Sequence, residues 1–499
     1  MLSRWRMMPR RSWRPVCKQR HRPVHGIRCT HTTSYINVLT LDRNKYGDGT
    51  PFFIDGAGHK MLFVLDPDHI KGILRASKEM DPNPFIHERI LGALMGSPPS
   101  AVDYYKSEGH NIDYIQTTHI RQHTTGSNLG LLDKRLFDTI KQTVGESLGS
   151  PGEWTEIPDL FAFVTHHLTY AIATTLLGTE LVASYPGLIA DLWVHIEATD
   201  QLFIGLPRFA IPKAYAARDR LLASFRAWST KSEELRKRNA VNTTWDPVAG
   251  SGLLQEREKL YSEKPGHDEY ARSAQTLGLL YGGTSLSVPI TFWYLFETLR
   301  TPNLHTRVLA EIKNHVDPEK NSYRFMQLTS RPLLQSLHAE TTRLYTVNLT
   351  VREVTSPVYA LDDKYSVPKG TTVFISNKWA GMYAPGWAKN RAQALARPLT
   401  TFWPERYLVH DGKRERFSDA GLSGNWMSFG GGEHKCPGRH FARNIGIVTL
   451  AVMMGEFELE VVDAERARRL NPDHKKKAFG TLFPTGKIAA RIRRRANYT

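Results

Sequence analysis

The sequence predicts a mainly α-helical protein with small β-sheets, folded as one large unit. From Pro67 to Arg300, apolar residues recur at spacings of three and four, which is the pattern of helices that bury one face. Runs rich in β-branched and aromatic residues, bounded by turn residues, occur before and after this region. No linker rich in Gly, Ser or Pro divides the 499 residues, and the 41% apolar content is enough for a large core.

The expected elements follow in chain order. A hairpin is expected over Pro51–Asp66, where two β-rich runs flank a turn that contains glycine. The helical pattern then covers five segments: Asp68–Arg75, Leu129–Leu148, Ile157–Leu177, Ala216–Arg238 and Ala271–Leu299. Strands are expected again in three pieces: Thr346–Val354, Thr371–Ser376 and the stretch near Gly480–Arg493. Both ends of the chain therefore contribute small sheets to a large helical body.

The formal net charge of +17 is concentrated at the start of the chain. Residues 1–34 contain eight Arg and one Lys but no acidic residue. They hold no apolar run long enough for a secretory signal, and Pro9, Pro15 and Pro23 interrupt any long helix. We expect a disordered basic leader over residues 1–34 and one folded domain over residues 35–499. A mitochondrial presequence fits the leader less well, and no RNA motif or aromatic platform accompanies the charge, so nucleic acid is not an expected partner.

Cysteine usage and hydropathy exclude two further classes. The three cysteines, Cys17, Cys29 and Cys436, are too few for a disulfide scaffold or for a zinc site with four cysteine ligands. No window reaches the ~18 consecutive apolar residues that span a bilayer. The best candidate, Leu160–Gly178, contains His166. The sequence therefore shows no transmembrane anchor.

The final cysteine lies in the most informative stretch of the chain, Phe429–Ala442 (FGGGEHKCPGRHFA). Three glycines before Cys436 allow the backbone to approach a large ligand closely, and Pro437 and Gly438 turn the chain into a helix expected to run through Met454. A thiol at a helix start has a lowered pKa, which stabilises the thiolate as a metal ligand. One thiolate suits a cofactor that brings its own other ligands, as haem does. The alternative interpretation is an inert buried thiol.

This stretch resembles the cysteine-ligand loop of the cytochrome P450 family, whose pattern is Phe-x-x-Gly-x-Arg-x-Cys-x-Gly. Phe429, Gly432, Cys436 and Gly438 match the pattern, and His434 stands where Arg is usual. The resemblance implies the cytochrome P450 fold as a single large haem domain, with haem b as cofactor and Cys436 as the axial ligand of its iron. Phe429, Gly432, His434 and Gly438 are then expected to bind the cofactor.

Two upstream motifs follow in the family's order. Glu340 and Arg343 lie three residues apart on one helix face, a spacing that by itself is usual for a solvated surface pair. They resemble the family's buried Glu-x-x-Arg motif, and Phe402–Tyr407 resembles its Pro-Glu-Arg-Phe element, in which the arginine is Arg406. The resemblance implies that Glu340, Arg343 and Arg406 form a structural network and take no part in the reaction.

A third motif departs from the family pattern. The apolar run Leu277–Arg300 contains a pair of glycines, and its periodicity alone predicts a buried, kinked core helix. By resemblance it is the helix that crosses the distal face of the haem, where a threonine beside an acidic residue relays protons. Here Ser285 replaces the acid and Leu286 replaces the first threonine. Ser285 and Ser287 are therefore the candidates for a distal proton relay.

Weaker signals concern the haem edge and the redox partner. Arg352 occupies a place where family members often bind a haem propionate, and His434 is a candidate for the other propionate; the alternative for Arg352 is an exposed strand arginine. Lys435, Arg439 and Arg443 cluster around the ligand loop. They are expected either to face an acidic electron donor or to form an ordinary basic surface.

The resemblance extends from about residue 40 to the C-terminus, and it points to a fungal member similar to the branch of the sterol 7-hydroxylases and prostacyclin synthase. It implies a monooxygenase that oxidises an apolar small molecule, in fungal secondary-metabolite or sterol/terpenoid biosynthesis. NADPH electrons are expected to arrive through a separate NADPH-cytochrome P450 reductase. The family also implies the endoplasmic reticulum membrane as location, engaged here by peripheral contact.

Two other hypotheses stay open at this stage. Leu286 cannot donate a proton, which favours an isomerase or dehydratase that rearranges a peroxide or an oxygenated substrate without a redox partner. A non-enzymatic haem- or nucleic-acid-binding protein would instead use the basic charge. Product formation that depends on an added reductase, conversion of a hydroperoxide without it, and the absence of haem distinguish the three.

Overall fold

The computed structural model describes residues 26–28, 49–56, 59–238, 241–301, 303–412, 414–474 and 479–495. Most of the leader predicted over residues 1–34 lies outside the described residues. Gly26–Arg28 form strand β1, which pairs in parallel with β2 (Phe52–Gly56). At these three residues the structure differs from the expected disorder, because the open edge of β2 offers backbone partners that the sequence pattern does not reveal.

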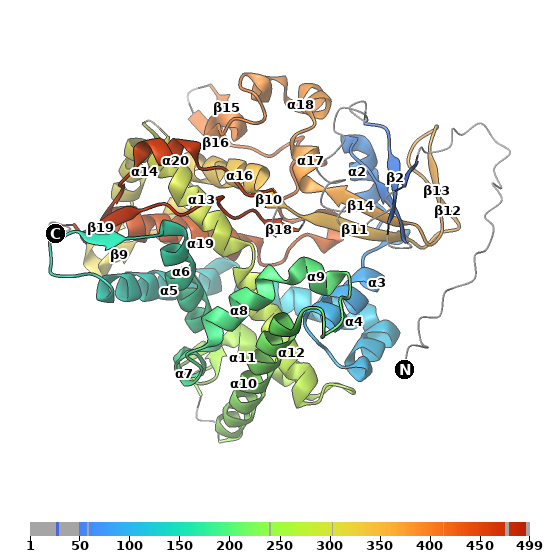
Figure 1. Cartoon of the computed structure of the whole chain (residues 1–499), viewed down its shortest axis with the longest axis horizontal. Helices are drawn as coiled ribbons and strands as arrows, with labels where there is room; N and C mark the ends of the chain where they lie inside the picture. Colours follow the sequence, from blue (N-terminus) through green and yellow to red (C-terminus); the bar gives the residue numbers. More distant parts are fainter. Residues whose placement is uncertain are drawn as a thin grey trace.

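Helices fill the left and lower parts of Figure 1, and the largest sheet lies at its right. The first helices along the chain are α2 (Pro67–Arg75), α3 (Asn83–Phe85), α4 (Pro99–His123), α5 (Gly126–Glu146), α6 (Leu160–Leu177), α7 (Thr179–Ser184), α8 (Leu188–Glu197), α9 (Thr199–Phe203), α10 (Pro212–Lys237), α11 (Gly252–Ser262) and α12 (Glu269–Thr284). The later helices are α13 (Ser287–Arg300), α14 (Leu304–Lys313), α15 (Phe325–Leu328), α16 (Pro332–Tyr345), α17 (Asn377–Gly381), α18 (Ala384–Arg391), α19 (Arg439–Leu450) and α20 (Ala464–Arg469). The predicted class, mainly α with small sheets, is confirmed.

The largest sheet joins strands from both ends of the chain in the order β1-β2-β3-β14-β11-β4. Its remaining members are β3 (His59–Phe63), β4 (Met80–Asp81), β11 (Leu349–Val354) and β14 (Thr372–Ser376). A three-stranded sheet has the order β17-β19-β5, and the two-stranded pair β10-β18 lies between the helices and the large sheet (Figure 1). These strands are β5 (Thr155–Ile157), β10 (Thr346–Val347), β17 (Phe457–Val461), β18 (Gly480–Thr481) and β19 (Ala490–Arg494).

The predicted elements agree with the structure except at two places. At one, a residue pairs with a distant strand; at the other, a helix-breaking residue interrupts a helix. The hairpin expected over Pro51–Asp66 is present as the antiparallel pair β2 and β3. Ile157, predicted as the start of a helix, belongs to β5 because it pairs with Ala490 of β19, and α6 starts only after Asp159 accepts a hydrogen bond from the Phe161 N–H.

The helix predicted over Ala271–Leu299 is two helices, α12 and α13, with Ser285 and Leu286 between them. Apolar residues recur at helical spacing on both sides of this break, because both α12 and α13 bury apolar side chains. The kink predicted for this helix is therefore present, as a break rather than a bend, and it lies close to Gly282-Gly283 and Pro289.

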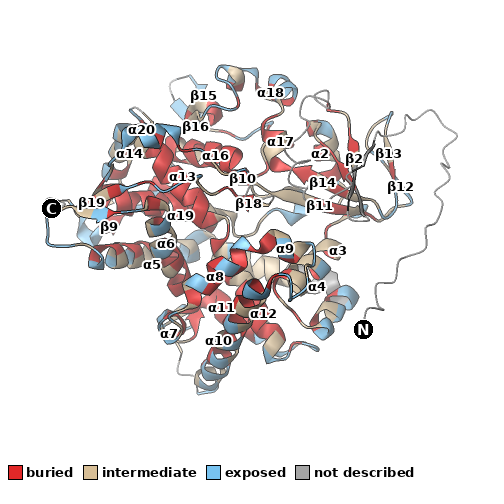
Figure 2. Ribbon diagram, viewed as in Figure 1, coloured by how far each residue is buried: buried red, intermediate tan, exposed pale blue. Residues whose placement is uncertain are grey.

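The core is centred on α13, α16 and α19, the mostly red helices near the middle of Figure 2. Trp293 of α13 is fully buried and stacks on Tyr345 of α16, with ring centroids 4.1 Å apart. The Tyr294 hydroxyl donates to the Leu334 carbonyl at 2.8 Å, so the same two helices are also joined by a buried hydrogen bond. Gly446 of α19 lets this helix approach α13, because a Cβ there would lie 2.9 Å from the Tyr294 ring.

One described helix, α6, is long and apolar enough to span a membrane by length and composition. In the structure, 61% of its 18 residues are buried inside the protein. This burial is what a core helix of a globular domain shows, and it supports the interpretation that Leu160–Gly178 belongs to the core.

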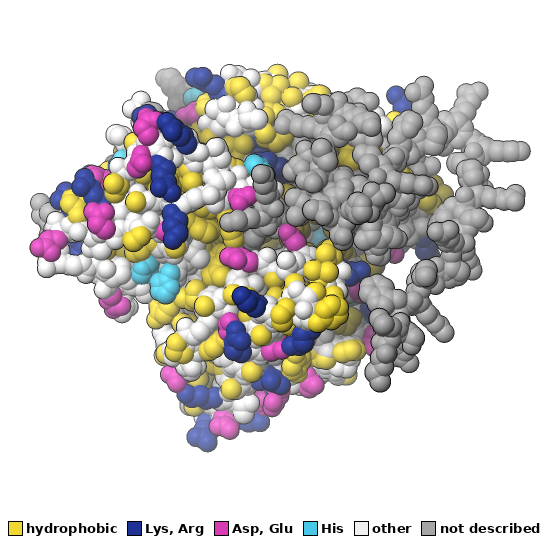
Figure 3. All heavy atoms as spheres, in the orientation of Figure 1, with side chains coloured by type: hydrophobic (Ala, Val, Ile, Leu, Met, Phe, Trp, Pro, Cys, Tyr) yellow, Lys and Arg dark blue, Asp and Glu magenta, His cyan; other side chains and the backbone are white. Residues whose placement is uncertain are grey.

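Charged side chains of both signs share the surface seen in Figure 3. Over α14, α20 and the nearby β19, basic and acidic side chains alternate rather than forming a field of one sign. Exposed ion pairs account for part of this pattern, as in Arg491 with Glu460 at 2.7 Å. Each such pair contributes little to stability, because both groups are solvated.

Candidate functional site

The loop before Cys436 adopts a conformation that glycine makes possible. Gly430 and Gly432 have φ angles of 68° and 67°, in the left-handed region that L side chains rarely adopt. A Cβ on Gly432 would clash with the Leu74 carbonyl oxygen at the end of α2. The Cys436 N–H then donates to the Phe429 carbonyl at 2.9 Å and closes the loop. The glycines therefore shape this loop through both φ and close backbone approach.

Cys436 has a partly exposed thiol just before α19. Burial raises the pKa of this thiol, whereas the Gly438 N–H and the Arg439 guanidinium act in the opposite direction. The expected lowering of the pKa is therefore wrong for the protein without its cofactor. The reason is that burial of the thiol outweighs the groups around it that favour the thiolate. Coordination to a metal would itself deprotonate the thiol.

Phe429 connects this loop to the helical core. Its ring lies parallel to that of His338 on α16, at a centroid distance of 6.0 Å and an interplanar angle of 3°. His338 is 4% exposed, and burial lowers its pKa to about 3, so the imidazole is neutral at physiological pH. The loop is thus supported by an uncharged aromatic contact and by no ion pair at this point.

Glu340, Arg343 and Arg406 form one buried network. The Arg343 guanidinium binds the Glu340 carboxylate through two hydrogen bonds of 2.7 Å, and Arg406 Nε donates to the same carboxylate at 3.1 Å. All three side chains are fully buried. The remaining Arg406 donors bind backbone carbonyls, those of Ala394, Arg397, Pro398 and Thr401. This is the geometry of a structural network, in which every buried charge has a partner.

The break between α12 and α13 arises from missing backbone bonds. The Ser285 N–H still donates to the Tyr281 carbonyl at 2.9 Å, and the Ile290 N–H donates to the Leu286 carbonyl at 3.1 Å. Pro289 has no N–H, so the Ser285 carbonyl lacks the partner that a continuous helix would provide. Ser285 therefore sits where the helix backbone is open.

One side of this broken helix faces free space. A Cβ on Gly282 would meet no atom within 4 Å, and Gly282 is exposed although most of α12 is buried. Ser285 and Ser287 are buried beside the break, at 5% and 7% exposure. Thr284, the other nearby alcohol, already donates its hydroxyl to the Leu280 carbonyl at 2.7 Å. The two serines proposed from the sequence, Ser285 and Ser287, therefore lie at the break between α12 and α13, where both are buried.

The end of α4 is a neighbour of the cysteine loop that sequence reasoning did not find. The Thr124 hydroxyl lies 3.3 Å from the Pro437 carbonyl, and the Ile120 side chain would lie 3.7 Å from a Cβ on Gly438. Arg121, the one arginine nearby in the sequence, is exposed. The available signal was the Thr-Thr pair that ends the helical pattern, but it does not identify the loop that lies more than 300 residues later.

Cys436 and Arg352, two of the residues proposed from the sequence to hold a cofactor, fit a group that is anionic at its edge and supplies most of its own metal ligands. Among the described residues, no group of three His, Cys, Asp or Glu side chains is placed to hold a metal ion, which leaves Cys436 as a single ligand. Arg352 on β11 is 6% exposed and donates a hydrogen bond to the Val351 carbonyl at 2.9 Å. A buried guanidinium without a carboxylate partner is costly, so this position calls for an external anion, such as a haem propionate.

The environment of Arg352 is consistent with that interpretation. Burial lowers its pKa to about 10, and the Asp81 charge only partly opposes this. Arg352 is therefore still protonated at neutral pH, and the alternative of an exposed strand arginine does not hold. His434, by contrast, is exposed and lies in the short helical turn Gly432–His434.

We expect Arg352→Gln to weaken haem retention by roughly 10- to 100-fold, because a charge-assisted hydrogen bond contributes about 1.5–3 kcal/mol. The measurement is the rate at which the purified protein loses haem to an excess of haem-free globin. Arg416→Gln is the matched control, since Arg416 is a strand arginine whose side chain is 62% exposed. If the two variants lost haem at equal rates, Arg352 would not be a haem-binding residue.

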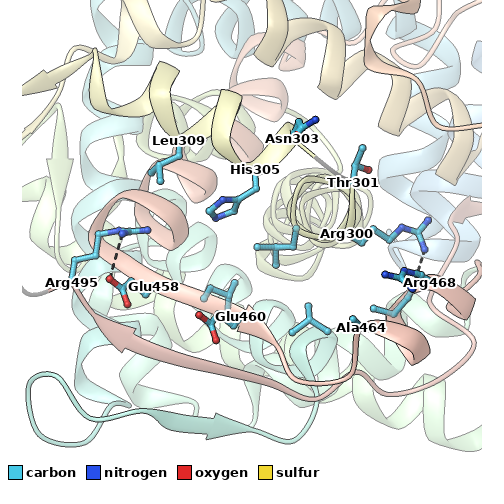
Figure 4. A pocket seen from close by; sticks show the side chains of 14 residues that line it. Arg300, Thr301, Asn303, His305, Leu309, Glu458, Glu460, Ala464, Arg468 and Arg495 are labelled. Carbon is cyan, nitrogen blue, oxygen red and sulfur yellow. Dashed lines mark hydrogen bonds and ion pairs between the residues drawn. The ribbon is translucent and has the colours of Figure 1, made fainter.

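A separate surface pocket lacks the features described for Cys436 and Arg352. It has a volume of about 670 Å³, and none of its lining residues belongs to the cysteine loop. Figure 4 shows Arg495 paired with Glu458 on one wall, at 3.5 Å, and Arg300 reaching in from another. Arg300 is itself bound to Glu297 at 2.6 Å. These arginines have carboxylate partners within the chain, unlike Arg352.

Comparison with known proteins gives consistent matches. The family model "Cytochrome P450" matches residues 251–489. The chain is 30% identical over 479 residues to the cytochrome P450 monooxygenase fsoE of Humicola fuscoatra, covering 90% of this chain and 82% of that protein. It is 29% identical over 488 residues to the cytochrome P450 monooxygenase efuG of Hormonema carpetanum, covering 90% and 84%. It is also 26% identical over 255 residues to the 25-hydroxycholesterol 7-alpha-hydroxylase of Rattus norvegicus, covering 49% and 59%.

Proposed function

This chain belongs to the cytochrome P450 family of oxidoreductases, and we propose that it hydroxylates or otherwise oxidises an apolar small molecule. The relatives are fungal monooxygenases and a sterol 7-hydroxylase, which confirms the branch indicated by the sequence. The observation that carries the proposal is Cys436, a single thiol at the end of a loop whose glycines have φ angles and close contacts unsuited to other residues.

The proposed roles of the other residues follow from their positions. Haem, when bound, supplies the one-electron and dioxygen chemistry. Cys436 would hold its iron, and Arg352 would bind a propionate. Phe429 would pack beside the thiolate, kept in place by the neutral His338. Glu340, Arg343 and Arg406 would preserve the fold around the cofactor and take no part in the reaction.

The electron source is proposed to be NADPH through a separate reductase. Lys435 is exposed on the ligand loop, and Arg439 and Arg443 follow it on α19. Positive charge near the cysteine loop complements an acidic electron-transfer protein and would speed its docking.

The place of action is proposed from the family and from one surface feature. Phe209 and Ile204, between α9 and α10, are 87% and 59% exposed. Large apolar side chains exposed together suit a peripheral contact with a membrane surface, as expected at the endoplasmic reticulum. By analogy with its fungal relatives, the enzyme is proposed to act on a secondary metabolite, a sterol or a terpenoid.

The other two hypotheses fare differently. The non-enzymatic one is wrong, because the family and the relatives are enzymes. The isomerase or dehydratase hypothesis is not favoured, because the relatives that cover most of the chain are named monooxygenases.

The test is reconstitution of the purified enzyme with a cytochrome P450 reductase. Extracts from a strain in which the gene has been deleted supply the accumulated precursor, identified by mass spectrometry. We expect product one oxygen atom heavier, or its dehydrogenated equivalent, only when both NADPH and the reductase are present. Conversion that proceeds at the same rate without either of them would instead establish the isomerase or dehydratase.

A further inference from the structure

Asn348 connects two strands beside the break between α12 and α13. It follows β10 and precedes β11 (Figure 1). Val347, the last residue of β10, pairs with Gly480 of β18, and a Cβ on Gly480 would lie 3.8 Å from the Leu286 side chain. Leu286 is half-buried at the break, four positions after the open side of Gly282. Asn348 is therefore the residue next to the strand pair that covers this break.

Asn348 extends the pairing of β11 with β14 by one residue. The Asn377 N–H donates to the Asn348 carbonyl at 3.0 Å, directly after the last registered pair of the two strands. Side chains alternate between the two faces of a sheet, so Asn348 shares a face with Thr350 and Arg352. Leu349 belongs to the other face, where it packs in a separate apolar cluster.

The face that carries Asn348 lies toward the cysteine loop. On β14, Ile375 and Val373 are the partners of the next two residues of this face, and cross-strand partners share a face. Both belong to the buried apolar cluster that contains Leu74 of α2. Leu74 adjoins the cysteine loop, because a Cβ on Gly431 would clash with its side chain. The side chain of Asn348 is thus placed between the distal helix and the loop of Cys436.

The chain holds the backbone of Asn348 but leaves its carboxamide oxygen unused. The Asn348 N–H donates to Asn377 Oδ1 at 2.5 Å, so both backbone polar groups of Asn348 are paired with one residue. Asn348 Oδ1 is buried and has no hydrogen-bond partner among the described residues. The residue as a whole is half-buried. A buried polar atom without a partner is unfavourable, so this oxygen calls for a hydrogen bond from a molecule outside the chain.

We propose that Asn348 is a specificity-determining residue whose carboxamide binds an oxygen function of the substrate. This inference rests on the proposed monooxygenase function and narrows its substrate class to apolar molecules that already carry a hydroxyl or carbonyl group. A carboxamide both donates and accepts hydrogen bonds, so it can pair with either group. A substrate without the oxygen function leaves the carboxamide unpaired, and the site therefore discriminates against it.

The first test uses 4-phenylimidazole and its ortho-, meta- and para-hydroxyphenyl analogues. The imidazole nitrogen binds haem iron and shifts the Soret band, so titration gives a dissociation constant for each compound. For at least one analogue, the ratio of its dissociation constant to that of 4-phenylimidazole should rise by about 2- to 10-fold in Asn348→Leu, the effect of losing one neutral hydrogen bond. Ratios that stay unchanged for all three analogues would overturn the proposal.

Thr350→Val is the matched control, because Thr350 is the next side chain on the same face and is also half-buried. It should leave every ratio unchanged. If Thr350→Val changed the ratios and Asn348→Leu did not, Asn348 would not be the contact. The backbone bonds of Asn348 do not depend on its side chain, so haem content and melting temperature should stay as in the unmodified protein. Asn348→Ala provides the same comparison if Asn348→Leu does not load haem.

The second test uses the precursor that accumulates when the gene is deleted. Its elemental composition should include at least one oxygen atom, and Asn348→Leu should raise its dissociation constant, measured by the Soret shift, by about 2- to 10-fold. A precursor that is a pure hydrocarbon, or an unchanged dissociation constant, would overturn the inference. Failure of the monooxygenase function is recognised separately. The unmodified enzyme would then form no product that depends on the reductase, whereas the imidazole titrations need only bound haem and still measure the contact with Asn348.

Discussion

Cys436→Ser is expected to abolish the red-shifted Soret band of the reduced, carbon-monoxide-treated protein and to remove activity that depends on the reductase. A serine hydroxyl is a hard, weakly acidic ligand, and it cannot replace the electron donation of a thiolate to iron. Replacing a residue that only hydrogen-bonds a metal ligand typically lowers metal affinity or activity by about 10- to 100-fold. Replacing the ligand itself should therefore lower turnover by more than about 100-fold. Absorption spectra and product formation measure the two effects.

The chain supplies a matched control for this substitution. Cys17 and Cys29 are the other two cysteines in the sequence, and both lie outside the described residues. A Cys17→Ser, Cys29→Ser double variant should keep the band and the rate. If Cys436→Ser kept the red-shifted band, Cys436 would not be the ligand, and the whole assignment of the site would be wrong.

Glu340→Gln should prevent the protein from accumulating as a folded, haem-loaded species. The substitution keeps the size of the side chain but leaves Arg343 and Arg406 facing a neutral amide in a fully buried site. Removing one member of a buried charge network costs about 3–5 kcal/mol, a large part of the 5–15 kcal/mol that stabilises a typical domain. Soluble yield, haem content per chain and thermal unfolding measure the loss.

Glu405→Gln is the control for this prediction, because Glu405 lies in the same short turn as Arg406 and also pairs with an arginine. Its bond to Arg307 is 2.6 Å long, but the two side chains are 34% and 45% exposed. Its removal should change stability by at most about 1 kcal/mol. Equal yields and melting temperatures for the two variants would show that burial of the Glu340 network has no special weight.

The helical body and the cysteine loop could be predicted from the sequence because both depend on local patterns. Apolar periodicity identified α2, α5, α6 and α10 to within a few residues. The glycines in the sequence predicted the loop before Cys436, and Gly430 and Gly432 have positive φ in the structure. Features fixed by distant partners were not predictable in the same way. Ile157 reads as helical until Ala490 is known to pair with it, and the contact of Thr124 with Pro437 joins residues 313 positions apart.

The candidate site shows the same division. The motif positions of Glu340, Arg343 and Arg406 predicted that they act together, and the structure brings them within hydrogen-bond distance. Tyr281 carries no motif, and its contact with the Thr199 hydroxyl, at 2.9 Å, appears only in the structure. The pKa of Cys436 was predicted in the wrong direction, because the sequence shows that a helix follows the cysteine but not how far burial outweighs it.

Two hydrogen bonds that hold the break between α12 and α13 come from residues 481 and 482. The Thr481 hydroxyl donates to the Leu286 carbonyl at 3.2 Å, 195 residues away, and the Trp293 indole donates to the Leu482 carbonyl at 2.7 Å, 189 residues away. Both contacts join residues nearly 200 positions apart, so α12 and α13 can take their final arrangement only after residues 481 and 482 have been synthesised.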